Sequence, residues 1–393
     1  DDRLAKKSQK TRARASGICQ TARMKRTYSL VAVGILAFGG VACGDAASVS
    51  ADASTDIWLS DPSSVDGHIV PADGDVKKDI AAEDAKIINL PADEAPHQTP
   101  MEWWYYTGVL NGQNGEIYGF EYVIFQAFAF GVTGYMTHYA ITDLQKGTFA
   151  LDSDQHVGAL PASTQPGFDL KIGNWTMSGH AGKDKLYADM PGYAIDLSLS
   201  ATKPVVFQYG TGAMTVGSAN PFYYYSYTRM DVSGTITVDD EAKTVTGEAW
   251  MDHQWGDVGT DYAGWDWYSL RLDDNTEVML FVVRKDGKDG FVGGTFIDEK
   301  GASMELKAED FTITSTGTWK SPRTEATYPL GWTISIPSLA LEATVDPLVQ
   351  DQEFYHSILG SPIYWEGLCS ITASRNGSPV GGDAYVELTS YTP

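Results

Sequence analysis

Long runs of aromatic and β-branched residues constrain the fold of this chain more than any other feature. Most side chains in residues 116–130, and again in residues 221–229, are of this kind. Such runs are typical of long strands that are buried on much of both faces. Turns that suit hairpins recur at residues 111–115, 273–275, 285–290 and 376–377. Because no segment beyond residue 43 has a convincing set of apolar residues at helical spacing, we predict an all-β protein with little helix.

The length of the chain favours two domains. A chain of 393 residues exceeds the usual size of one globular domain. A sheet built from so many strands must also protect its edges, and closure into a barrel does so. We therefore predict two adjacent antiparallel β-barrels, residues 96–257 and 258–393, with their boundary in the Gly- and Asp-rich stretch at residues 255–262.

Charge is distributed unevenly along the chain. Nine of the 28 Lys and Arg residues lie within the first 43 positions, whereas 51 Asp and Glu residues give the whole chain a net charge of −23. The part that is expected to fold is therefore strongly acidic, and such a field repels phosphate backbones. We expect no nucleic-acid partner, and the simplest consequence of the charge is solubility.

The first 43 residues have the layout of an export signal. Lys25 and Arg26 precede an apolar run, residues 30–42, which ends in small residues and Cys43. The run is too short to be a permanent transmembrane helix, and it is similar to a lipoprotein signal whose Cys receives lipid. We predict an upstream extension outside the true protein at residues 1–23, a signal peptide at 24–43 and an acidic flexible tether at 44–95.

Lipid on Cys43 would hold the protein at a bacterial cell envelope, either in the periplasm or on the outer surface. An ordinary cleaved signal, with Cys43 as a bystander, is the alternative that the same residues leave open. Cys369 has no disulfide partner in the lipoprotein interpretation, and we expect it to be a buried, inert thiol.

Four blocks rich in Trp, Tyr and Gly carry a family resemblance. They lie at residues 102–108, 250–256, 264–268, and 364–367 together with 381–391. In order and spacing they resemble the lipocalin-like CrtC/AttH family, whose members include carotenoid 1,2-hydratases, a fungal hydratase of prenylated phytoalexins and polyketide cyclases. The resemblance covers residues 96–393 and implies two tandem lipocalin-like barrels and an activity that needs no cofactor.

The His-x-Trp pair of the second block supplies the site residues that the resemblance implies most directly. Side chains alternate between the two faces of a strand, so His253 and Trp255 project together with Met251, and Asp252 projects the other way. The resemblance implies that such a pair works with an acid, but the family's Tyr-x-Asp acid has no clear match here. Asp252 is one candidate for that acid. A core histidine bonded to a backbone carbonyl is the alternative role for His253.

Asp266 is the leading candidate for the missing acid because it stands between Trp265 and Trp267. Aromatic walls would desolvate its carboxyl group and raise its pKa, which would suit a proton donor. Tyr268 shares a strand face with Asp266. The alternative is that Asp266 caps a turn or forms an ion pair with an arginine such as Arg271.

Aromatic residues of the same blocks are candidates for a ligand site. We expect six of them to line a pocket for a long apolar, isoprenoid- or polyketide-like molecule: Trp103, Trp104, Trp255, Trp265, Trp267 and Tyr268. Two functions fit such a pocket, a cofactor-free carotenoid 1,2-hydratase-like enzyme and a non-enzymatic lipocalin-type carrier. A shielded carboxylate within reach of His253 would favour the enzyme.

The sequence predicts no metal site. The seven His residues are scattered without metal-ligand spacing, and the Asp- and Gly-rich turns lack the full calcium-loop pattern. Glu102, Glu121 and Gln126 are polar residues within apolar blocks and must find hydrogen-bond partners. A structural role is the first expectation for each of them.

Overall fold

A computed structural model describes residues 88–163, 165–214, 221–257, 264–285, 288–356 and 362–391. Its regular structure is almost entirely β-strand, apart from the short 3-10 turns η2 (Ala92–Glu94), η3 (Ala308–Asp310) and η4 (Pro337–Leu339). The all-β prediction is therefore confirmed. Cys43, the predicted signal and nearly all of the predicted tether lie outside the described residues. Within the described ranges, no helix is long and apolar enough to span a membrane.

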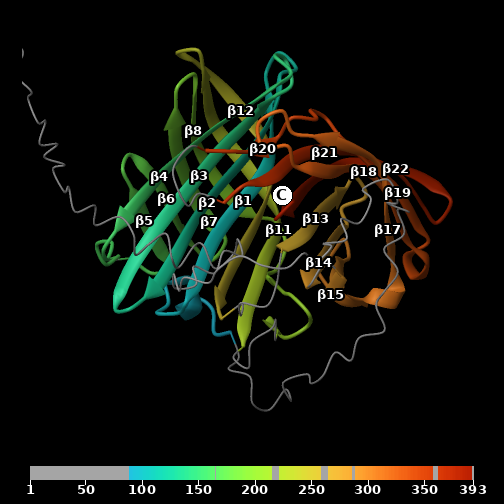
Figure 1. The fold of residues 1–393 in the computed structure, drawn as a ribbon, viewed down its shortest axis with the longest axis horizontal. Coiled ribbons are helices and arrows are strands. Elements are labelled where there is room, and N and C mark those ends of the chain that lie inside the picture. Colours follow the sequence, from blue (N-terminus) through green and yellow to red (C-terminus); the bar gives the residue numbers. More distant parts are fainter. Residues whose placement is uncertain are drawn as a thin grey trace, which may run out of the picture.

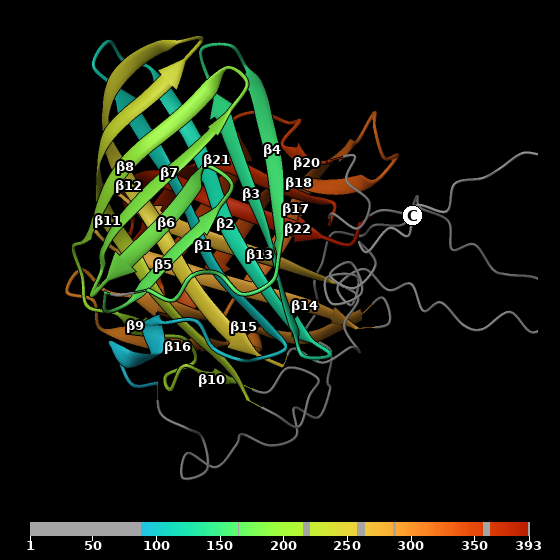
Figure 2. The same ribbon diagram turned by 90° about the vertical axis from the view of Figure 1, so that its left-hand side faces the viewer.

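The first sheet contains twelve strands in the order β4-β3-β2-β1-β12-β11-β8-β7-β6-β5, with the short strands β9 and β10 paired to β11. Figures 1 and 2 show that this sheet curls strongly into a barrel-like shape. Its strands are β1 (Met101–Gly112), β2 (Ile117–Ala129), β3 (Val132–Asp143), β4 (Thr148–Val157), β5 (Phe168–Ile172), β6 (Trp175–His180), β7 (Lys183–Met190), β8 (Tyr193–Ala201), β9 (Val206–Phe207), β10 (Ala213–Met214), β11 (Phe222–Val238) and β12 (Glu241–Gly256).

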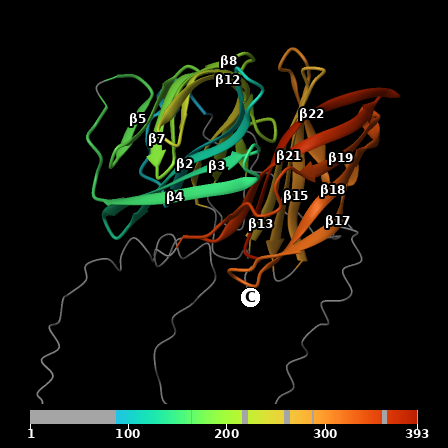
Figure 3. The same ribbon diagram turned by 90° about the horizontal axis from the view of Figure 1, so that it is seen from above.

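The second sheet contains ten strands in the order β16-β15-β14-β13-β22-β21-β19-β18-β17, with β20 paired to β21. Figure 3 shows it as a second curved sheet beside the first. Its strands are β13 (Gly264–Leu272), β14 (Glu277–Lys285), β15 (Lys288–Ile297), β16 (Ser303–Lys307), β17 (Thr312–Lys320), β18 (Thr327–Ile336), β19 (Leu341–Pro347), β20 (Glu353–Phe354), β21 (Tyr364–Arg375) and β22 (Ser378–Thr389).

In each sheet the first long strand along the chain pairs with the last one, β1 with β12 and β13 with β22. This pairing brings two of the aromatic blocks side by side, because Glu102 lies opposite Trp255 and Trp104 lies opposite His253. On the other side of β12, Tyr225 of β11 lies opposite His253. Residues that are far apart in the sequence therefore become neighbours around His253.

Apolar side chains form one core inside each sheet and a third core between the two sheets. Met251 and Trp255 belong to the core of the first sheet, and the free thiol of Cys369 is buried in that of the second. The third core joins Trp250 of the first sheet to Trp267 of the second. Strands such as β12 are thus buried on both faces, which accounts for the unusually long aromatic runs.

Candidate functional site

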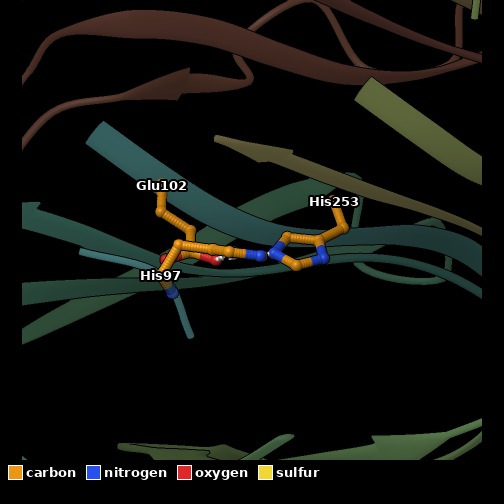
Figure 4. Close-up of side chains that lie close together, drawn as sticks. All are labelled: His97, Glu102 and His253. Atoms are coloured by element: carbon orange, nitrogen blue, oxygen red, sulfur yellow. Dashed lines mark hydrogen bonds and ion pairs between the residues drawn. The ribbon is translucent and has the colours of Figure 1, made fainter. Parts of the chain in front are cut away.

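Three polar side chains from separate parts of the chain meet beside β1 and β12. His97 precedes β1, Glu102 lies in β1 and His253 lies in β12, and their polar ends face one another (Figure 4). Glu102 Oε1 lies 2.8 Å from His97 Nδ1 and 2.8 Å from His253 Nε2. One carboxylate oxygen therefore bridges both imidazole rings. We call these three residues the His–Glu–His cluster.

The remaining polar atoms of the cluster are held as well. Glu102 Oε2 accepts the backbone N–H of His97 at 2.7 Å and Nε2 of Gln126 at 3.0 Å. On the far side of His253, Nδ1 lies 3.1 Å from the hydroxyl of Tyr225. Glu102 and Gln126 thus have the structural partners that were expected, and Glu102 is in addition a shielded carboxylate within reach of His253.

Aromatic rings enclose the His–Glu–His cluster. The ring of His97 stacks on Trp255 with centroids 4.4 Å apart, and the ring of His253 stacks on Trp104 at 4.7 Å. The side chains of Glu102 and His253 are fully buried, whereas that of His97 is 16% exposed. Burial lowers the pKa of His253 despite the opposing effect of Glu102. His97 is therefore the member of the cluster that a reactant can approach.

Asp266 lies outside the His–Glu–His cluster. It stands on β13 in the second sheet, where it forms an ion pair with Arg284 and accepts a hydrogen bond from the hydroxyl of Tyr391 at 2.9 Å. Arg271, which was considered as its partner, pairs instead with Asp383. The acid that contacts His253 is thus Glu102 rather than Asp266. Asp266 forms an ion pair, as its alternative role proposed, but its partner is Arg284 and not Arg271.

Asp252 lies on the opposite face of β12, between the two sheets. Its carboxyl group accepts hydrogen bonds from the hydroxyls of Tyr224 at 2.7 Å and Ser226 at 2.5 Å, and from Nε1 of Trp250 at 2.7 Å. Burial raises the pKa of Asp252 to about 7, and the three donors oppose this shift. Since both oxygens accept bonds within the core between the sheets, Asp252 does not join His253 in one site.

The six aromatic candidates do not gather around one site. Trp104 and Trp255 enclose the His–Glu–His cluster. The other four lie elsewhere: Trp103, Trp265 and Trp267 in or against the core between the sheets, and Tyr268 inside the second sheet.

Two buried carboxyl groups form reciprocal hydrogen bonds between the sheets. Tyr105 of the first sheet donates to Glu366 of the second at 2.8 Å, and Tyr364 of the second donates to Glu121 of the first at 2.7 Å. The other oxygen of each carboxyl group has no hydrogen-bond partner among the described residues. Burial raises the pKa of Glu121 to about 8, and burial together with Glu121 raises the pKa of Glu366 well above its usual value.

Glu121→Gln is expected to weaken the pH dependence of stability. Because the pKa of Glu121 is raised from 4.5 to about 8 on folding, its stabilising contribution is fully present below pH 4.5 and is lost as the pH rises towards 8. In that window one such group changes the free energy of unfolding by about 1.4 kcal/mol per pH unit. Gln cannot ionise, so thermal unfolding followed by circular dichroism should show a smaller loss of melting temperature between pH 6 and 8.

A matched control is Glu241→Gln, which removes an exposed carboxylate from β12. It should keep the wild-type slope of melting temperature against pH. Parallel slopes for Glu121→Gln and the wild type would contradict the assignment of a raised pKa to Glu121.

Comparison with known proteins identifies the family. The family model described as AttH-like matches residues 81–391, a range that includes every strand of both sheets. This chain belongs to the AttH-like family. The resemblance that the aromatic blocks suggested is therefore confirmed.

Solved and curated relatives agree with the AttH-like assignment. The crystal structure of an AttH-assigned protein from Nitrosomonas europaea has 28% identity and a TM-score of 0.71, and the match covers 79% of this chain and 98% of that one. Kievitone hydratase from Nectria haematococca shares the fold, with 18% identity, a TM-score of 0.64 and coverage of 79% and 95%. The dehydratase asqC of Emericella nidulans is 23% identical over 215 residues, 52% of this chain, and the match spans only 60% of the relative's length.

In this AttH-like chain, the sequence analysis named His253 and Trp255 as candidates, but it did not name His97 and did not place Glu102 beside His253. His97 stands alone before β1, and nothing in its neighbourhood marks it as a site residue. The signal for Glu102 is its position in the aromatic block at residues 102–108, which pairs with the His-x-Trp block once β1 lies beside β12.

Proposed function

We propose that this AttH-like chain is a hydro-lyase that adds water to, or removes water from, a carbon–carbon double bond of a long apolar molecule. The His–Glu–His cluster would transfer the proton. The observation that carries this proposal is the bridging of His97 and His253 by the buried carboxylate of Glu102. The names of two relatives, a hydratase and a dehydratase, support the reaction class, because the two reactions are one equilibrium run in opposite directions.

The His–Glu–His cluster has the parts that general acid–base catalysis requires. Glu102 orients the ring of His97 through Nδ1, and the partial exposure of His97 leaves this ring open to a reactant. In the direction of hydration, protonated His97 gives its proton to one alkene carbon, and a cation forms at the other carbon. Water then adds to this cation and returns a proton to the cluster, so no cofactor is consumed.

An isoprenoid- or polyketide-like substrate is proposed because aromatic rings surround the cluster. Trp104 stacks on His253, and Trp255 stacks on both His97 and Tyr223. The buried rings of Trp104 and Trp255 keep the surroundings of the cluster apolar, which suits a hydrocarbon chain better than a sugar or a nucleotide. A carrier would bind the same class of molecule without converting it.

The test is turnover in heavy water. The purified protein is incubated in D₂O with a panel of isoprenoid and polyketide alkenes and their hydrated forms, and the products are followed by mass spectrometry and NMR. We expect loss or gain of one water and deuterium at the protonated carbon. If the protein binds these molecules but neither change occurs, the carrier function would replace the proposed enzyme function.

We further propose that Cys43 carries the lipid anchor and places the protein at the cell envelope. The support for this comes from the sequence alone, since residues 1–87 lie outside the described ranges. Incorporation of a fatty-acid probe into the wild type, and its loss in Cys43→Ala, is the expected result. Labelling that persists in Cys43→Ala would refute the anchor.

A further inference from the structure

We propose that the His–Glu–His cluster is a binding site for a divalent metal ion of the zinc class. One ring nitrogen of His97, one ring nitrogen of His253 and one carboxylate oxygen of Glu102 all lie within 4.8 Å of one another. Some catalytic zinc sites bind the ion through two imidazoles and one carboxylate and leave the fourth coordination position open for water or substrate. Nitrogen ligands favour zinc and related ions over magnesium or calcium.

Each donor group is already oriented by a partner on its outer side. His253 Nδ1 meets the hydroxyl of Tyr225 at 3.1 Å, and His97 Nε2 lies 3.6 Å from a carboxylate oxygen of Asp93. Glu102 Oε2 is held by Gln126 and by the backbone N–H of His97. Metal-ligating histidines and carboxylates usually have such outer partners, which fix the ring orientation. The cluster therefore has the outer contacts of a metal site as well as the donor set.

The distances show what binding would change. Glu102 Oε1 is 2.8 Å from each ring nitrogen, whereas donors around a tetrahedral zinc ion with bonds of 2.0–2.1 Å are about 3.3 Å apart. An ion would therefore take the place of the hydrogen bonds that now join the carboxylate to the rings. His97 is the ligand that can adjust, because it precedes β1 and is partly exposed, while the other two side chains are held in strands.

This site cannot be recognised from the sequence, because one of its three ligands lies far along the chain from the other two. His97 lies five residues before Glu102, and His253 lies 151 residues after Glu102. The pairing of β1 with β12 brings them together. Across the ranges that the structure describes, no second group of three such side chains meets the same distance criterion. The sequence analysis expected no metal because the histidines are scattered along the chain. Our proposal departs from that expectation, because folding brings two of these histidines and Glu102 together.

This inference rests on the proposed function and deepens it, because an ion bound by these three side chains would replace the protons that they otherwise transfer and would supply Lewis acidity in the same place. The metal site itself is inferred from the donor set and its outer contacts. It can therefore be tested without a substrate.

The experiment uses the full chain, purified without a polyhistidine tag and freed of metal by chelation. Zn²⁺ is titrated by calorimetry, and Co²⁺ is titrated by visible absorption, which reports the coordination geometry. We expect one equivalent of each ion to bind and Co²⁺ to give the intense bands of a four- or five-coordinate site. His97→Ala and Glu102→Gln should each weaken the binding of Zn²⁺ by about a hundredfold or more, which is at least the effect of losing an outer partner.

The matched control is His180→Ala, which removes a histidine of the first sheet that pairs with Glu94 and does not belong to the group of potential metal ligands found among the described residues. It should bind Zn²⁺ as the wild type does. Circular dichroism of His97→Ala shows whether the fold is intact, and the position of His97 before β1 makes it the mildest of the ligand substitutions.

Two outcomes separate this inference from the proposed function. Turnover by protein that contains no metal and binds none would overturn the metal site and leave the hydro-lyase standing. Binding of one equivalent of Zn²⁺ that depends on His97 and Glu102, without turnover of any alkene, would establish the metal site and remove the hydro-lyase. Binding that persists in both His97→Ala and Glu102→Gln would also overturn the site.

Discussion

Glu102→Gln is expected to lower turnover in the heavy-water assay by about 10²–10⁴-fold, the range that acid–base catalysis usually contributes. Gln has nearly the shape of Glu, but it replaces one acceptor oxygen by an amide that donates. The wild-type carboxylate meets His97, His253 and Gln126 at the same time, and an amide cannot satisfy all of these contacts. Both imidazole rings should therefore lose their fixed orientation, and kcat should fall more than substrate affinity.

The comparison variant for this prediction is Asp266→Asn. Asp266 is bound to Arg284 and Tyr391 in the second sheet, so its substitution should leave turnover by the folded protein close to that of the wild type. Should Asp266→Asn abolish turnover while Glu102→Gln retains it, the acid of the reaction would be Asp266, and the His–Glu–His cluster would have a structural role.

The faces of individual strands could be predicted from the sequence, because they depend only on alternation along one strand. His253 and Trp255 do share the face of β12 that points into the first sheet, and Trp250 lies on the other face. The partner of His253 could not be predicted in this way. Glu102 reaches it through the pairing of β1 with β12, and no local pattern specifies which two strands close a sheet.

The sequence did contain the information that excludes Arg271 as the partner of Asp266 and favours Arg284. Arg271 is five positions further along the same strand, and an odd separation places the two side chains on opposite faces. The turn predicted at residues 273–275 folds β14 back onto β13, so that Val282 lies opposite Asp266. Arg284, two positions beyond Val282, then stands diagonally across from Asp266 on the same face, within reach of a long side chain.

Glu277 provides the prediction with the largest effect on stability. Its fully buried carboxylate on β14 of the second sheet binds two cations, with Oε2 2.8 Å from Nζ of Lys203 in the β8–β9 connection and Oε1 2.7 Å from Nε of Arg229 in β11 of the first sheet. Glu277→Gln leaves Lys203 without its counter-charge, whereas Arg229 keeps its ion pair with Glu248. Removing one partner of a buried ion pair usually costs about 3–5 kcal/mol. Urea unfolding should show a loss of this size.

The position of Glu277 also predicts how the variant unfolds. Because Arg229 and Glu277 come from different sheets, the loss of their ion pair should weaken the contact between the sheets more than the interior of either one. Calorimetry of Glu277→Gln should then resolve two transitions where the wild type shows one. Glu325→Gln, which removes an exposed partner of Lys320, is the control and should leave both the free energy of unfolding and the shape of the transition unchanged.

A triple variant distinguishes the contribution of the charges to stability from the contribution of packing at this contact. Replacing Lys203 and Arg229 by Met together with Glu277→Leu removes both signs of charge and keeps apolar volume at the three positions. Buried ion pairs are often no more stabilising than well-packed apolar groups of similar size, so the triple variant should recover most of the stability that Glu277→Gln loses. Arg229 also donates to Glu248 and to the carbonyl of Leu272, and Lys203 also donates to the carbonyls of Asn275 and Asp298. The loss of these four bonds sets the part that is not recovered. A triple variant no more stable than Glu277→Gln would show that the ions themselves hold the sheets together.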